Sequence, residues 1–199
     1  MAFNILSLVA SGRTASVSSS LVRELVAHLQ AVHADASVVS HDLVQNPLPV
    51  VNDGWVGGAF APPAARTPQQ AEELKLSDRL VDELLAADAI VIGTPIYNFS
   101  IPAALKAWID QIVRAGRTFT YHGPGQFSPL VPAGKKVYVV VTSGGVPAGS
   151  PYDAATSYLK LVLGFVGLTD VTVIAADQLQ TVGEAQIARA KAEIAALAG

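Results

Sequence analysis

The sequence predicts a single α/β domain built on a five-stranded parallel sheet with helices on both faces. Short apolar runs alternate along the chain with leucines and valines at helical spacing. At 199 residues the chain is long for one core and short for two, and no composition break or internal repeat marks a boundary within 1–199. Five strands that are each followed by a helix require right-handed crossovers, which produce a parallel sheet.

The first half of the chain is expected to contain two strands and two helices. The apolar run 3–9 lacks a basic leader and breaks at Ser11-Gly12, so it is expected to be a strand rather than a signal peptide. A helix over 18–32 and a short strand over 36–40 follow. The Pro- and Gly-rich segment 46–63 is expected to be irregular. Thr67-Pro68-Gln69-Gln70 then has the order of a helix start, with a capping threonine, a first-turn proline and a capping-box glutamine.

The second half continues the alternation. The strand that begins at Ala89 is apolar on both faces, which is typical of a central strand in a parallel sheet. Pro102 opens a helix that is expected to end near Gly116 as a left-handed cap. Segment 117–134 is expected to be irregular. The remaining elements are a strand over 136–142, a helix from Ser150 towards Phe165, a strand over 171–175 and a closing helix over 184–197.

Three loops are expected to form one site. Five strands rather than six favour the flavodoxin-like order 2-1-3-4-5 over the six-stranded dinucleotide-binding order. In that order the loops after the first and third strands, 10–20 and 94–101, converge at the switch point. Loop 142–150 lies beside them. Open α/β sheets bind their ligands at this edge, so function is expected to reside in these loops.

Loop 10–20 has the features of an anion site. It leads directly into a helix N-terminus, whose free N–H groups attract negative charge, and Ser11, Ser16 and Ser18 add hydroxyl donors. The loop has neither a P-loop lysine nor the G-x-G-x-x-G pattern of a pyrophosphate site, which favours a monophosphate. The alternative is that these serines only cap the helix and fill a turn.

The other two loops suit a flat aromatic ligand. Loop 94–101 offers two aromatic rings, one amide side chain and a backbone stiffened by proline, from the run Pro95, Ile96, Tyr97, Asn98 and Phe99. Such a surface fits a heteroaromatic ring better than a metal. Loop 142–150 begins Thr142, Ser143, Gly144, Gly145. Its glycines let a backbone N–H approach a ring edge, although paired glycines also occur in plain tight turns.

Composition excludes several classes of function. The net charge of −3 and the pI near 5.7 give no basic footprint for nucleic acid. The absence of cysteine excludes disulfides, thiolate metal sites and a cysteine nucleophile. No apolar run reaches the ~18 residues of a membrane span, and a cytoplasmic location is expected. The histidines have no metal-ligand arrangement, so no metal is expected; they are His28, His33, His41 and His122.

Taken together, these motifs resemble the FMN-dependent NADH-azoreductases, within the flavodoxin-like NAD(P)H:quinone oxidoreductases. The resemblance covers nearly the whole chain. It is carried by Ser16-Val17-Ser18, Asn46-Pro47-Leu48-Pro49, Pro95 to Phe99, Lys106 to Asp110, Arg114 to Phe119, Thr142 to Gly145 and Leu163 to Gly167. There are two departures. Family members often carry paired serines where this chain has Val9 and Ala10. They also often carry an arginine or a similar residue before the paired glycines, whereas in this chain Gly144 directly follows Ser143.

The resemblance implies a homodimer with two FMN sites at the subunit interface. Each FMN takes a hydride from NADH and passes it to a quinone or azo compound by ping-pong exchange, so no catalytic protein group is required. It also implies roles for particular residues. Ser11, Ser16 and Ser18 hold the phosphate, Tyr97 and Phe99 flank the isoalloxazine, and Val17, Pro95, Ile96, Asn98, Thr142, Ser143, Gly144 and Gly145 complete the cofactor site.

The same resemblance implies an apolar slot in which nicotinamide and acceptor bind in turn, shaped by Phe119, Tyr121 and Phe165. Trp55, Phe60 and Phe127 are large apolar residues in the segments expected to be irregular, and they are candidates for the subunit interface. We expect Trp55 to reach the partner's pocket, whereas Trp108 is expected to pack in the core. Two alternatives remain: a flavodoxin-type one-electron carrier, which the modest net charge disfavours, and a non-catalytic flavin sensor.

Overall fold

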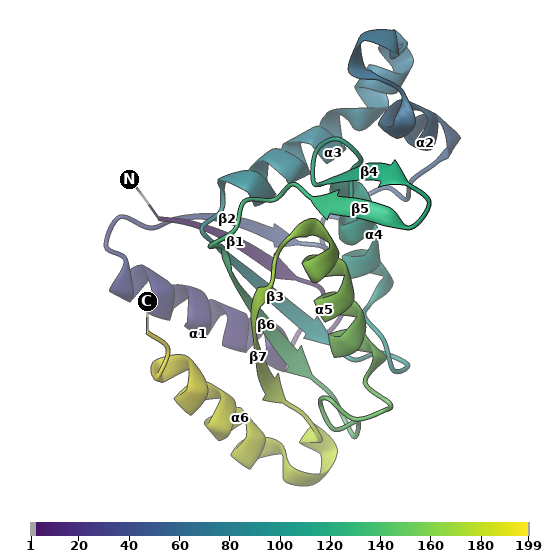
Figure 1. The fold of residues 1–199 in the computed structure, drawn as a ribbon. Helices are drawn as coiled ribbons and strands as arrows, with labels where there is room; N and C mark the ends of the chain where they lie inside the picture. Colours follow the sequence, from purple (N-terminus) through teal and green to yellow (C-terminus); the bar gives the residue numbers. More distant parts are fainter. Residues whose placement is uncertain (1–2, 199) are drawn as a thin grey trace.

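A five-stranded parallel sheet runs through the centre of the computed structural model, which describes residues 3–198 (Figure 1). Its strands lie in the order β2-β1-β3-β6-β7, which confirms the predicted order 2-1-3-4-5 once a separate hairpin, β4–β5, is set aside. The strands are β1 Asn4–Val9, β2 Ser37–Asp42, β3 Ala89–Pro95, β6 Lys136–Thr142 and β7 Asp170–Ala176. The single domain expected over 1–199 includes residues 1–2 and 199, which lie outside the described residues.

Helices cover both faces of the sheet (Figure 1). On one face lie α1 Val17–Val32 and α6 Leu179–Ala195, and on the other lie α3 Pro68–Ala86, α4 Ala103–Ile112 and α5 Ala154–Val166. The central strand β3 is buried along its whole length. Because side chains alternate along a strand, Ile90 and Ile92 enter one core, while Ala89 and Val91 enter the other. No helix within 3–198 is both long and apolar enough to cross a membrane.

Gly93 lets α1 lie close to the central strand. A Cβ atom at this position would lie 2.5 Å from Cγ2 of Val22, which is closer than real Cβ contacts allow. The backbone carbonyl of Ser18 lies 3.4 Å from the same point. Glycine in β3 therefore places the first turns of α1 directly beside the carboxyl end of the sheet, where ligands bind in this class of fold.

The expectation that 117–134 is irregular is wrong. The segment forms an antiparallel hairpin of β4, Phe119–Gly123, and β5, Gln126–Pro129. Its turn has positive φ at Gly123 and Gly125, 140° and 71°, which glycine adopts without steric cost. The hairpin lies against the end of α5, where the N–H of Val131 donates to the carbonyl of Val166. It is not part of the main sheet.

The expectation that 46–63 is irregular is also wrong in part. A short helix, α2, spans Asp53–Phe60, and a 3-10 turn, η1, spans Pro63–Ala65. The side chain of Asn52 caps α2 by accepting from the N–H of Trp55 at 2.8 Å. Trp55 itself is buried, and its Nε1 donates to Oε1 of Gln111 at 2.9 Å. The expectation that Trp55 reaches a partner subunit is therefore wrong for this chain.

Several helix ends differ from the expected ones. The Thr67 capping box of α3 is confirmed, with Gln70 as its partner. The cap of α5, however, is Asp153 rather than Ser150, because its carboxylate accepts from the N–H of Thr156 at 2.9 Å.

Helix α4 ends at Ile112, well before the left-handed Gly116, which belongs to the following turn. Helix α6 begins five residues earlier than expected, after a left-handed Gln178. Trp108 is fully buried in the core, as predicted.

Candidate functional site

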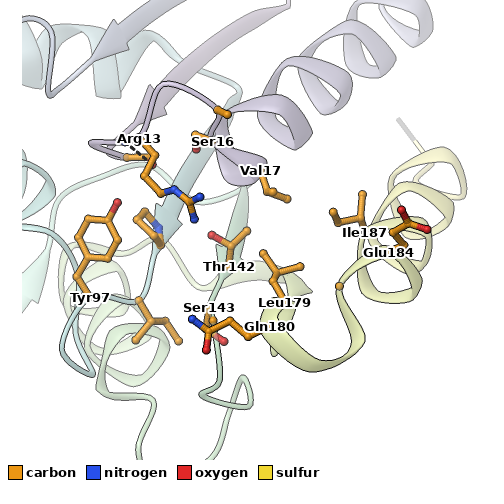
Figure 2. A pocket seen from close by; sticks show the side chains of 16 residues that line it. Arg13, Ser16, Val17, Tyr97, Thr142, Ser143, Leu179, Gln180, Glu184 and Ile187 are labelled. Atoms are coloured by element: carbon orange, nitrogen blue, oxygen red, sulfur yellow. Dashed lines mark hydrogen bonds between the residues drawn. The ribbon is translucent and has the colours of Figure 1, made fainter.

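A pocket of about 500 Å³ opens at the carboxyl ends of β1, β3 and β6, between the starts of α1 and α6 (Figure 2). The three loops that the strand order predicts to converge all contribute to its wall. The predicted cofactor residues that line it are Ser11, Ser16, Val17, Pro95, Ile96, Tyr97, Thr142, Ser143 and Gly144. The topology therefore brings together side chains that are more than 100 residues apart in the sequence.

Four predicted cofactor residues do not line this pocket. Ser18 lies beneath the wall, only 1% exposed, with its Oγ 3.1 Å from Oγ of Ser16. Asn98 and Phe99 form the tip of the turn that follows Tyr97. Gly145 is exposed next to the wall residue Gly144. All four adjoin the pocket in sequence.

The start of α1 has the features of an anion site. Ser16 caps the helix, with its Oγ accepting from the N–H of Ser19 at 3.1 Å. The N–H groups of Val17 and Ser18 precede the first possible intrahelical partner, so they are left to bind a ligand. The helix dipole adds roughly half a positive charge at the same place. A phosphate here would receive backbone hydrogen bonds without any side-chain base.

The turn after β3 is tight and strained. Tyr97 and Ser100 exchange two backbone hydrogen bonds of 2.9 and 3.0 Å around Asn98 and Phe99, whose φ angles are +48° and +71°. Positive φ at both central residues is the type I′ pattern, in which phenylalanine is unfavourable. The carbonyl of Phe99 accepts from the N–H of Ala154, which ties the turn to the start of α5. Strained residues of this kind concentrate at functional sites.

The loop after β6 is bound to the start of α6. Oγ of Ser143 accepts from the N–H of Gln178 at 3.1 Å and donates to the carbonyl of Val146. The carbonyls of Ser143 and Gly144 each accept, at 3.0 Å, from the N–H groups of Leu179 and Gln180. The side chain of Gln180 lies over Gly144, with its amide carbon 3.2 Å from where a Cβ would be.

The start of α6 therefore forms a fourth part of the wall, which the sequence analysis missed. It contributes Leu179, Gln180, Gly183, Glu184 and Ile187. Arg13, in the loop before α1, also lines the pocket and was missed. Its place between the serines of loop 10–20 was a signal in the sequence, whereas the start of α6 depends on the left-handed Gln178, which no pattern predicts.

The three residues predicted to shape a substrate slot lie elsewhere. Phe119 and Phe165 are in contact at 4.9 Å between ring centroids, and Phe127 joins them at 5.2 Å from Phe165 and 6.0 Å from Tyr121. We call these four residues the aromatic cluster. It joins the β4–β5 hairpin to the last turn of α5. Figure 1 shows the hairpin at the opposite end of α5 from the loop after β3, which is tied to Ala154 at the start of α5 and contributes Tyr97 to the pocket. A helix of 13 residues is about 20 Å long, so the two sites are well separated within one chain.

The histidines all have structural contacts. His28 bonds to the carbonyl of Leu197, His41 to Glu83 at 2.6 Å and His122 to Ser128 at 3.1 Å, and His33 stacks on Phe3. Within residues 3–198 no group of three or more histidines and carboxylates is placed to hold a metal ion.

The donors around the pocket fit flavin mononucleotide. One helix N-terminus is available for one phosphate, which matches a mononucleotide better than a dinucleotide with two phosphates. Tyr97 contributes an aromatic ring to the wall, and Thr142, Ser143 and Gly144 of the loop after β6 also line it. The volume of about 500 Å³ lies within the range of small-molecule and cofactor sites.

Comparison with known proteins agrees with this arrangement. The profile of the flavodoxin-like fold matches residues 3–198. An FMN-dependent NADH:quinone oxidoreductase of Jannaschia sp. is 47% identical, over 98% of this chain and 98% of its own length. One from Hahella chejuensis is 44% identical, over 96% and 93%. The crystal structure of an azoreductase from Bacillus anthracis superposes with a TM-score of 0.87 at 28% identity, covering 97% of each chain.

These likenesses span the whole described chain rather than one motif, and they confirm the resemblance drawn from the sequence. This chain belongs to the flavodoxin-like fold family, together with the FMN-dependent NADH:quinone oxidoreductases.

Proposed function

We propose that this chain is an FMN-dependent oxidoreductase that transfers a hydride from NADH to quinones and azo compounds. The observation that carries the proposal is the pocket itself, which joins an anion-binding helix start to an aromatic wall and a polar loop. Relatives of nearly the same length are named for this activity, and a structural neighbour is named an azoreductase.

The residues around the pocket bind and orient the cofactor. The N–H groups of Val17 and Ser18, with Ser11 and Ser16, hold the phosphate at the start of α1. Tyr97 flanks the ring system, and the backbone of Ser143 and Gly144 contacts its polar edge. FMN supplies the redox chemistry when it is bound, so no protein nucleophile or acid–base pair is needed. The residues that line the pocket include none arranged for such a role.

The working enzyme is proposed to be a homodimer. Phe119, Tyr121 and Phe165 do not line the pocket of their own chain, so a slot over its cofactor needs aromatic side chains from another source. Tyr121 is 58% exposed, and its neighbour Phe127 is 49% exposed, so the aromatic cluster presents an apolar surface to a second molecule. A second copy would bring its aromatic cluster to this pocket and would form the slot that each chain lacks.

Two measurements on the purified protein test this proposal. The first is its bound flavin, released by denaturation and identified by chromatography; we expect about one FMN per chain and no stoichiometric metal. The second is the initial rate of NADH oxidation with a quinone. If NADH and acceptor occupy one slot in turn, double-reciprocal plots give parallel lines, as ping-pong exchange requires.

The outcomes separate the alternatives. A one-electron carrier would bind FMN but would react slowly with NADH in a stopped-flow experiment, and a flavin sensor would show no turnover with NADH and quinone. Intersecting lines would indicate a ternary complex and separate sites for NADH and acceptor. Bound FAD in place of FMN would contradict the single phosphate site at α1.

A further inference from the structure

One cation lies on the wall of the cofactor pocket. Arg13 belongs to the loop between β1 and α1, and Figure 2 shows its guanidinium extending into the pocket near Ser16 and Thr142. Its backbone N–H donates to Oγ of Ser11 at 3.3 Å, which fixes the loop beneath it. No other lysine or arginine lines this pocket, and the one carboxylate, Glu184, lies across it on α6. Within residues 3–198 the guanidinium forms no ion pair.

Side-chain donors for a phosphate are few at this helix start. Ser16 and Ser18 lie 3.1 Å apart, so one of their two hydroxyl protons is shared within the pair. Ser18 is also 1% exposed, which keeps its Oγ away from a ligand in the pocket. At the end of β1, Ala10 is fully buried and has only a methyl group, so it cannot donate a hydrogen bond. The neutral donors at the helix start include the backbone N–H groups of Val17 and Ser18, one hydroxyl proton of the serine pair and the hydroxyl of Ser11.

A cation would also improve the charge balance at this helix start. A phosphate monoester carries about −1.5 to −2 charges at pH 7. A helix N-terminus supplies only about half a positive charge, and the hydroxyls supply none. Arginine presents a planar fork of donors that matches phosphate oxygens, and its charge does not depend on pH in the physiological range. Arg13 has the charge, the reach into the pocket and the freedom from other ion pairs that this task demands.

We propose that Arg13 binds the cofactor phosphate and is the residue by which this chain selects flavin mononucleotide over riboflavin. The inference rests on the proposed function, because it takes the phosphate to lie at the start of α1. Selection by charge rather than by neutral hydrogen bonds makes the preference for FMN sensitive to salt.

The test is a comparison of two ligands that differ only in the phosphate. The full-length protein is freed of flavin and titrated with FMN and with riboflavin, following the quenching of flavin fluorescence. In Arg13→Met we expect the FMN dissociation constant to rise about 10- to 100-fold, because one charge-assisted hydrogen bond to the phosphate is lost. The riboflavin dissociation constant should stay within about twofold of the wild-type value. Arg13→Lys keeps the positive charge but not the planar guanidinium, so its loss of FMN affinity should be smaller than that of Arg13→Met.

The matched control is Arg23→Met, which removes the same charge from an exposed position on α1 that does not line the pocket. This substitution should change neither the FMN affinity nor the riboflavin affinity. Riboflavin binding by Arg13→Met also reports whether the pocket is still folded. Raising the salt concentration should also reduce the difference in FMN affinity between the wild type and Arg13→Met. It should have no such effect on their riboflavin affinities.

Two results would overturn the inference about Arg13: unchanged FMN affinity in Arg13→Met, or an equal loss for FMN and riboflavin. A different result would overturn the phosphate site of the proposed function itself. If the wild-type protein bound riboflavin as tightly as FMN, the pocket would not bind the phosphate, and the role proposed for Arg13 would also be wrong. Wild-type selection for FMN that persists in Arg13→Met refutes only the role of Arg13.

Discussion

Ser16 has two tasks at the start of α1, because it caps the helix and also lines the pocket. Replacing Ser16 and Ser18 together with alanine should therefore reduce both stability and FMN affinity. Loss of the cap costs about 1 kcal/mol of unfolding free energy. Loss of the Ser16 hydroxyl, which lines the pocket, should cost roughly 1.5–3 kcal/mol of FMN binding.

The control for the cap is Thr67→Ala, which removes an equivalent N-cap from α3 away from the pocket. It should lower the free energy of unfolding in urea by a similar amount and leave flavin titration unchanged. If the double serine variant retained wild-type FMN affinity, the phosphate would lie elsewhere in the pocket.

Phe99 is in a backbone conformation that disfavours its side chain. Its φ of +71° is easily adopted by glycine, and a non-glycine residue in this region costs about 1–2 kcal/mol. Its ring is 55% exposed and packs loosely on Tyr152, at 6.0 Å between centroids. We expect Phe99→Gly to stabilise the flavin-free chain by about 0.5–1 kcal/mol, but to weaken FMN binding if the ring covers the cofactor. Thermal melts with and without FMN give both quantities, and a lower melting temperature without FMN would show that the strain argument is wrong.

Helix α2 depends on one anchor rather than on its own sequence. Three of its eight residues are glycines, which are poor helix formers. Trp55 compensates, because it donates to Gln111, and its ring lies 5.5 Å from the guanidinium carbon of Arg114. Arg114 is fully buried, and this burial lowers its pKa although Asp78 lies 3.3 Å away. The helix therefore forms only where tertiary contacts are available.

We expect Trp55→Ala to release α2 without unfolding the sheet. Truncating a buried tryptophan costs about 3–5 kcal/mol if the surroundings stay in place, which exceeds what a glycine-rich helix can support. Amides of 53–60 should lose protection in hydrogen exchange, while those of β3 keep theirs. Trp55→Phe retains most of the packing and loses one hydrogen bond, so its effect should be nearer 1–3 kcal/mol. Uniform loss of protection across the chain would show that α2 is not an independent unit.

The elements that could be predicted from sequence are those whose pattern is local. The central strands are continuous apolar runs, and Thr67 to Gln70 has every residue of a capping box. Helix α2 was missed because its glycines argue against a helix and Trp55 acts only through distant partners. The β4–β5 hairpin was missed although Gly123 and Gly125 mark its turn, because the strands are short and lie outside the main sheet.

The same distinction applies to the site. Strand order brought loops 10–20, 94–101 and 142–150 to one pocket, so their lining residues could be predicted from topology. The start of α6 could not, since it depends on hydrogen bonds from Gln178, Leu179 and Gln180 to the loop after β6. The sequence motifs also placed the aromatic cluster in the site, but within one chain the fold keeps it away from the pocket.

At the scale of the whole molecule, self-association is the property to test. Phe60 is 73% exposed at the end of α2, and Phe127 belongs to the exposed aromatic cluster. Buried aromatic residues often dominate an interface, so replacing both with serine should weaken dimerisation by about 2 kcal/mol or more. Val39→Ser, on the edge strand β2, is the control. Light scattering over a dilution series measures the effect, and a wild-type monomer with full activity at all concentrations would contradict the dimer.

The separation of the aromatic cluster from the pocket along α5 has a genetic consequence. If each site combines the pocket of one chain with the cluster of another, two inactive variants can complement each other. Gly144→Trp would block the pocket, and Tyr121→Ala with Phe165→Ala would remove the cluster. In a mixed dimer one site carries both lesions and the other carries neither. With random pairing of equal amounts, about a quarter of the wild-type activity should return on mixing. If each chain builds its whole site alone, mixing restores nothing.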